Sequence, residues 1–160
     1  MIDSTKTESR HPATGEEAVA LKLLVVLARA NASVTAHLHA QVAQHGLTLT
    51  EFGILEVLYH KGPLLLGEVQ RRILVSSGGV TYLVDRLERK GLVERRACTE
   101  DRRARYAALT AEGEALISRI FPEHAQLITG LMSSLSTAEQ RSAIELLRTL
   151  GRDAAARTLP

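Results

Sequence analysis

The sequence predicts a mostly α-helical protein that carries one small β-hairpin. Apolar residues make up 45% of the 160 residues, but aromatic residues make up only 3% and Trp is absent. A core of Leu, Val, Ile and Ala suits packed helices better than a strand-rich sandwich. Apolar residues also recur at helical spacing through most of the chain. The length is that of one domain or one compact subunit.

The N-terminal part predicts an arm followed by a long helix. Residues 1–15 are polar and lack periodicity, so we expect a flexible arm. A helix is expected from Glu16 to about His45, and Gly46 is a suitable stop for it. The apolar residues that repeat at helical spacing are Leu24, Leu27, Val34, Leu38 and Val42.

Three further helices are expected before residue 91. Thr48–Glu51 has the pattern of a capping box and begins a helix that Gly62-Pro63 ends. A short helix is expected at about Leu66–Ile73. After a tight connection, a helix from about Ser77 to Lys90 places apolar residues on one face.

The remaining segments predict a hairpin and two helices. Leu92–Arg96 and Arg105–Leu109 flank a polar stretch and are expected to form a two-stranded hairpin, although the alanines in the second segment are poor strand formers. Thr110 can cap a helix over about Ala111–Ser133. A second capping box, Ser136–Glu139, begins a last helix that runs to about Ala156.

Basic residues are concentrated in the middle of the chain. The span from Arg71 to Arg105 contains ten basic and five acidic residues, a net +5, whereas the whole chain carries only +2. The remainder is therefore slightly acidic. A basic segment in such a chain indicates a localised site for a polyanion.

The order helix, short helix, turn, helix and basic hairpin is that of a winged helix-turn-helix. A helix fits the major groove of duplex DNA, the preceding helix sets its register, and a hairpin can place arginines at the minor groove. The apolar stripe of the Ser77–Lys90 helix leaves a polar face outward. The residues on this face are Ser77, Gly78, Thr81, Tyr82, Asp85, Arg86 and Arg89. We expect Ser77, Gly78, Thr81, Tyr82 and Arg86 to contact DNA.

Several motifs together resemble the MarR family of regulators. Residues 74–96 resemble that family's recognition-helix signature, and Asp101-Arg102-Arg103 resembles its wing. Leu109–Gly113 resembles the exit from the wing into the fifth helix, and Leu146–Leu150 resembles the family's last helix. The resemblance is tight over about residues 47–113 and looser in the flanking helices.

The resemblance implies an intertwined helical homodimer that binds double-stranded DNA at a near-palindromic operator, usually as a repressor. A small-molecule effector, for instance an aromatic one, or an oxidant would release the DNA. By similarity, Asp101 would brace the wing, Arg103 would enter the minor groove, and Arg102 and Arg105 would contact phosphates.

The resemblance also divides the chain into four parts. The expected parts are a flexible arm at 1–15, a dimerisation helix at 16–46, a winged helix-turn-helix DNA-binding domain at 47–110, and C-terminal dimerisation helices at 111–160.

Two regulatory sites are candidates. Cys98 lies near Arg95, Arg96 and Arg102, and nearby cations favour the thiolate, so a redox-responsive regulator is an alternative to a ligand-responsive one. The cysteine also fits an incidental wing position. His37 is a candidate effector contact together with Asn31 and Ser33, or a partly buried histidine of the helix.

Other functions find little support in the sequence. No catalytic or nucleotide-binding motif is recognisable, so no enzyme activity and no cofactor are expected. His37 and His39 are two positions apart on a helix and do not share a face, so no metal site is expected. The longest apolar run, Leu23–Ala28, is too short to span a membrane, and a cytoplasmic location is expected. A winged-helix module that binds proteins instead of DNA is the remaining alternative.

Overall fold

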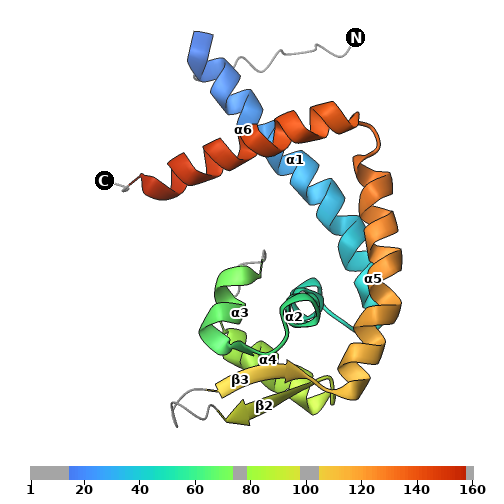
Figure 1. Ribbon diagram of the computed structural model, residues 1–160. Coiled ribbons are helices and arrows are strands. Elements are labelled where there is room, and N and C mark those ends of the chain that lie inside the picture. The colour runs from blue at the N-terminus through green and yellow to red at the C-terminus, as the bar shows by residue number, and fades with distance from the viewer. Residues whose placement is uncertain (1–14, 74–78, 98–104, 158–160) are drawn as a thin grey trace, which may run out of the picture. The chain divides into compact units, whose positions relative to one another are not determined.

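The computed structural model describes residues 15–73, 79–97 and 105–157 and shows a mostly helical chain with one small antiparallel sheet (Figure 1). This fold class is the one predicted from the sequence. The elements in chain order are α1 (Gly15–Ala43), α2 (Leu49–Lys61), β1 (Leu64–Leu65), α3 (Leu66–Arg72), α4 (Val80–Arg89), β2 (Val93–Ala97), β3 (Arg105–Leu109), α5 (Ala111–Met132) and α6 (Thr137–Ala156).

The sheet has three strands in the order β1-β3-β2, whereas the sequence predicted a hairpin of two. Strands β2 and β3 form the expected hairpin, with Val93 opposite Leu109 and Ala97 opposite Arg105. The missed strand, β1, places Leu64 opposite Ala107. Two residues are too few to show an alternating pattern, so β1 was not detectable in the sequence.

The chain divides into two compact units, residues 1–37 and 38–160. The second unit contains the core, in which residues from α2, α3, α4, α5 and the sheet pack together around Phe52, Leu55 and Leu87. The alanines that weakened the strand prediction, Ala107 and Ala108, are almost fully buried. Their small side chains suit a strand that packs closely under helices, so packing overrides intrinsic propensity here.

The two capping boxes predicted from the sequence are both present. The Thr48 hydroxyl accepts from the Glu51 amide, and the Glu51 carboxylate accepts from the Thr48 amide. Ser136 and Glu139 make the same reciprocal pair at the start of α6. Each box satisfies amides that the first turn of a helix leaves without partners.

Helix α4 begins three residues later than predicted. The predicted start was Ser77, but the structure begins the helix at Val80. Gly79 stands just before it with φ of +112°, a left-handed conformation that glycine adopts without strain. Gly79 therefore provides the left-handed backbone conformation that precedes α4.

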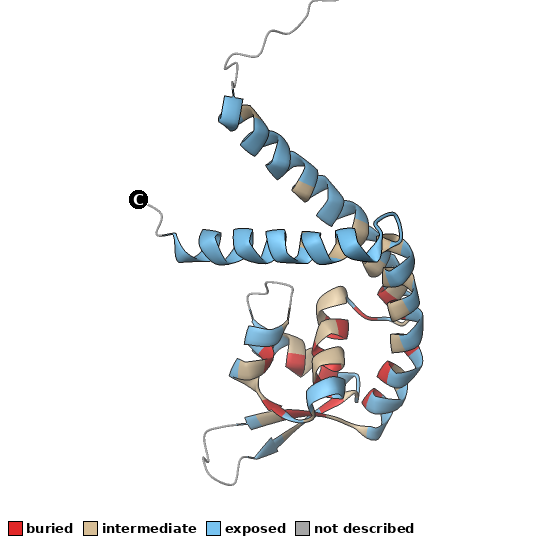
Figure 2. Ribbon diagram, turned by 45° about the horizontal axis from the view of Figure 1, so that its top comes forward, coloured by how far each residue is buried: buried red, intermediate tan, exposed pale blue. Residues whose placement is uncertain are grey.

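Most residues of the helices at the two ends of the chain are exposed, as the pale blue colouring of Figure 2 shows, and large apolar side chains are among them. Val42 is the buried residue of α1, and α6 has none among its residues. By length and composition alone, α1 also meets the criterion for a membrane-spanning helix, which its short unbroken apolar run did not predict. One such helix is weak evidence, because soluble core helices and signal sequences meet the same criterion.

Candidate nucleic-acid interface

Helix α4 presents a polar ridge and buries the opposite face. Val80, Val84 and Leu87 are buried in the core. Thr81, Tyr82 and Arg89 are exposed, and 58% of the Tyr82 surface is accessible. This is the arrangement that a helix needs to enter a major groove while it stays attached to its domain.

One flank of α4 is held to the sheet by an arginine. The Arg95 guanidinium on β2 pairs with the carboxylates of Asp85, at 2.7 Å, and Glu88. The Arg95 amide also donates to Glu88 Oε1 at 3.0 Å. Asp85 was expected to face outward, and 48% of its side chain is exposed while it pairs with Arg95.

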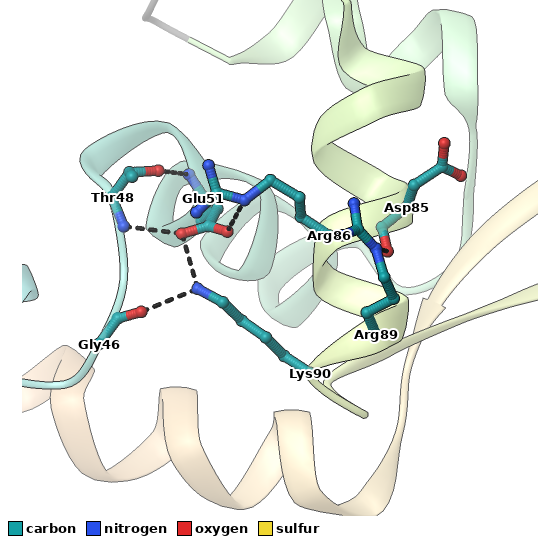
Figure 3. Close-up of polar contacts among 7 residues, drawn as sticks. All are labelled: Gly46, Thr48, Glu51, Asp85, Arg86, Arg89 and Lys90. Carbon is teal, nitrogen blue, oxygen red and sulfur yellow. Dashed lines mark hydrogen bonds and ion pairs between the residues drawn. The ribbon is translucent and has the colours of Figure 1, made fainter.

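The other flank of α4 is held to the start of α2 by a buried carboxylate (Figure 3). Glu51 is fully buried. Its Oε2 accepts from Lys90 Nζ at 3.0 Å, and Arg86 Nε lies 3.2 Å from Oε1. Lys90 Nζ also donates to the Gly46 carbonyl at 2.8 Å. The structure thus uses Glu51 both as a helix cap and as the counter-ion of two cations on α4.

The charge of Glu51 is stabilised by these partners. Burial by itself would raise the pKa of this carboxyl, because a charge is costly to remove from water. The Thr48 amide, Lys90 and Arg86 outweigh burial and leave the pKa of Glu51 below its ordinary value. The contact with Arg86 is an ion pair without hydrogen-bond alignment, since Oε1 accepts no hydrogen bond among the described residues.

The predicted DNA contacts, together with the predicted wing-bracing residue Asp101, divide into three groups. Thr81 and Tyr82 lie on the exposed ridge, and Arg105 is exposed at the start of β3. Arg86 is paired with Glu51, which the sequence did not predict, and 33% of its side chain is exposed. The third group lies outside the described residues and consists of Ser77, Gly78, Asp101, Arg102 and Arg103.

The base of the wing is joined to α5 by a close approach. The Thr110 hydroxyl donates to the Gly91 carbonyl at 2.6 Å and accepts from the Gly113 amide at 3.0 Å. A Cβ on Gly113 would lie 2.0 Å from the Leu92 carbonyl oxygen, so this position admits only glycine without a backbone shift. The Thr-x-x-Gly spacing therefore fixes how α5 leaves the wing.

The candidate effector residues lie on α1. Asn31, Ser33 and His37 are all exposed. A hollow of about 250 Å³ lies elsewhere, with walls from the end of α2, β3 and the start of α5. Cys98 lies outside the described residues.

Comparison with known sequences identifies relatives along most of the chain. Residues 45–104 match the sequence profile of the MarR family. The chain is 43% identical over 134 residues to the HTH-type transcriptional regulator MhqR of Bacillus subtilis, which covers 84% of this chain and 92% of the relative. It is 42% identical over 132 residues to an uncharacterized HTH-type regulator of the same organism, YkoM, across 82% and 86% of the two chains.

Solved structures show the same fold. Sco3205, a MarR family regulator from Streptomyces coelicolor in complex with DNA, is similar with a TM-score of 0.77 and 24% identity, over 91% of this chain and 92% of that one. BpsR of Bordetella bronchiseptica, whose DNA binding is regulated by 6-hydroxynicotinic acid, is similar with a TM-score of 0.72 and 25% identity, over 81% and 98%.

Proposed function

We propose that this chain, which belongs to the MarR family of DNA-binding transcription regulators, is a repressor that a small-molecule effector releases from a near-palindromic operator. The family consists of regulators and not of enzymes. The observation that carries the proposal is the exposed polar ridge of α4, held on both flanks by ion pairs. A transcription regulator acts inside the cell, and we assign this one to the cytoplasm.

We assign DNA contact to both α4 and the wing. Thr81 and Tyr82 would contact bases or phosphates in the major groove. By the family resemblance, Arg103 would enter the minor groove, with Asp101 bracing the turn. The remaining proposed contacts are Ser77, Gly78, Arg102 and Arg105. Arg86 is excluded because its guanidinium is paired with Glu51.

The proposed repressor is a homodimer built on α1 and α6. Both helices expose large apolar side chains, for example Leu24, at 62%, and Leu146, at 72%. Exposed apolar surface of this extent is typical of an interface with another chain. We assign residues 16–46 and 111–160 to dimerisation, 47–110 to DNA binding, and leave 1–15 as an arm.

The proposed effector is a small aromatic acid. BpsR, which shares 25% identity with this chain, responds to 6-hydroxynicotinic acid, a molecule of that class. Such an effector must bind the DNA-fitting and DNA-misfitting states differently in order to act. Asn31, Ser33 and His37 are proposed contacts, and oxidation of Cys98 is the alternative signal.

A fluorescence-anisotropy titration tests the function. The purified protein is titrated with the intergenic duplex beside its own gene and with a scrambled duplex, at several salt concentrations. We expect a preference of about 10³ or more for the intergenic duplex, with affinity that falls steeply with salt. Equal weak binding to both duplexes and to a genome-wide selected pool would contradict DNA recognition and favour a protein-binding role.

Replacement of Thr81 tests base recognition by the ridge. Thr81→Ala removes a hydroxyl and a methyl from the exposed face without touching the core. We expect the preference for the operator to fall by about tenfold, since a base contact is worth about 1–3 kcal/mol, while binding to scrambled duplex stays the same. An unchanged preference would remove Thr81 from the recognition surface.

A further inference from the structure

Two adjacent cations at the end of α4 have different surroundings. Arg89 is exposed on the ridge, and its side chain donates to the Asp85 carbonyl. Lys90 points the other way, toward the start of α2, where its ammonium lies between Glu51 and the Gly46 carbonyl (Figure 3). Both residues carry the same charge and both are exposed, but the Lys90 ammonium is bound to Glu51 and the Gly46 carbonyl, whereas Arg89 lies on the ridge.

Arg86 and Lys90 are four positions apart and therefore share one flank of the helix. The two side chains meet the same carboxylate, one at each oxygen of Glu51. Glu51 is fully buried, whereas about a third of each cationic side chain is exposed. A protein is strongly destabilised when a buried carboxylate loses its cations, so there is a physical reason for Arg86 and Lys90 to stay beside Glu51.

The second capping box shows that a cap does not require this arrangement. Glu139 makes the same hydrogen bonds to Ser136 at the start of α6. It is exposed, and no cation of the described residues pairs with it. The cations at Glu51 therefore serve something other than capping, and they come from α4 (Arg86) and from the residue that caps its C-terminal end (Lys90).

We propose that Glu51 is a positioning residue for DNA recognition, which holds α4 through Arg86 and Lys90 and withholds these two cations from the DNA phosphates. The inference rests on the proposed DNA-binding function. It predicts that phosphate attraction comes from the ridge and the wing, and that the fixed orientation of α4 gives the protein its sequence preference.

The salt dependence of DNA binding tests the withheld cations. Each phosphate neutralised by a cation contributes about 0.9 to the slope of log K against log salt. Lys90→Gln should leave the slope at its wild-type value, whereas the neighbouring substitution Arg89→Gln should reduce it by about 1.8, because the proposed dimer carries two copies of Arg89. A reduction of the same size with Lys90→Gln would overturn the proposal.

Neutralisation of Glu51 tests its positioning role. Glu51→Gln retains an oxygen for the Thr48 amide but frees both cations in each subunit, so the slope should steepen by about 1.8 or more and the operator preference should fall about tenfold. Glu139→Gln is the matched control and should change neither. A folded Glu51→Gln protein with wild-type slope and preference would overturn the proposal, as would equal changes in the Glu139→Gln control.

A chemical measurement without DNA separates this proposal from the proposed function. Both Lys61 and Lys90 are exposed, but the Lys90 ammonium is paired with Glu51, so acetylation of the full-length protein, followed by mass spectrometry, should modify Lys90 more slowly than Lys61. In Glu51→Gln the two rates should converge. Equal rates in the wild type would overturn the pairing whatever the DNA result. If the wild type shows no duplex preference but protects Lys90, the proposed function fails and the pairing stands.

Discussion

From Val42 to Ile120, the described part of the chain buries sixteen apolar side chains, whereas α6 buries none and most of α1 is exposed. The first region completes its core within one chain. The terminal helices are as regular, and α6 is as well capped, but their apolar faces lack cover from the described residues. Good local helix signals therefore say little about whether a single chain buries the helix.

This difference predicts that truncation of a large side chain destabilises the fold when the residue lies in the core and weakens association when it lies in α6. The largest effect is expected in the core. Phe52 is 1% exposed and its ring lies 4.3 Å from that of His124, centroid to centroid. Phe52→Ala should lower the free energy of unfolding by about 3–5 kcal/mol at any protein concentration. Urea unfolding measures this loss. Tyr82→Ala, on the exposed ridge, is the control and should stay within about 0.5 kcal/mol of the wild type.

Helix α5 contains a smaller contrast between two glycines. Gly113→Ala should cost about 1–3 kcal/mol, because the new methyl would collide with the Leu92 carbonyl at the base of the wing. Gly130 has open space around it, so Gly130→Ala should raise stability by up to about 1 kcal/mol. Thermal unfolding of both variants measures the difference. Equal effects on the free energy of unfolding would mean that the backbone accommodates a methyl group at Gly113 without cost.

Truncation in α6 should weaken association instead of the fold. Leu147 is 48% exposed, so coverage of that surface by a second copy is worth about 1 kcal/mol. Leu147→Ala removes this side chain from both subunits and should raise the dimer dissociation constant about 30-fold, as measured by analytical ultracentrifugation. Thr149→Ala, on the same helix, is the control. A monomeric wild-type protein would contradict the assignment of α1 and α6 to dimerisation.

The smallest expected effect is a dependence of core stability on pH. Burial lowers the pKa of His124 below its ordinary value. The unfolded chain therefore binds a proton that the folded chain resists, and stability should fall as the pH drops below about 6.5. The folded-state pKa of Glu51 is also lowered, but the stability that this carboxylate contributes is lost only below about pH 4.3. The pH ranges in which His124 and Glu51 affect stability are therefore different.

Urea midpoints at pH 7.5 and pH 5.5 measure the His124 effect. His124→Gln should lose stability at pH 7.5 and show a smaller change between the two pH values than the wild type. Parallel pH profiles for the two proteins would assign the acid sensitivity to other groups.

The sequence was sufficient for most elements of the fold. Both capping boxes, the glycine stops and the apolar periodicity involve residues within a few positions of one another, so local pattern identifies them. The sequence was also sufficient to predict that Thr81 and Tyr82 are exposed, because the buried stripe of Val80, Val84 and Leu87 lies on the opposite face of α4. The proposed DNA contacts at residues 77–78 and 101–103 stay predictions.

Contacts between residues that are far apart in the sequence were determined by the tertiary structure alone. The pairing of Leu64 with Ala107 adds a strand that local pattern does not reveal. Glu51 has the sequence signature of a cap, and nothing within its own helix shows that Lys90, 39 positions away, supplies a counter-ion. Helical periodicity tells which residues share a face, but the packing of α2 against α4 determines which charge meets that face. For Arg86, this packing adds an ion pair with Glu51 that the sequence did not predict.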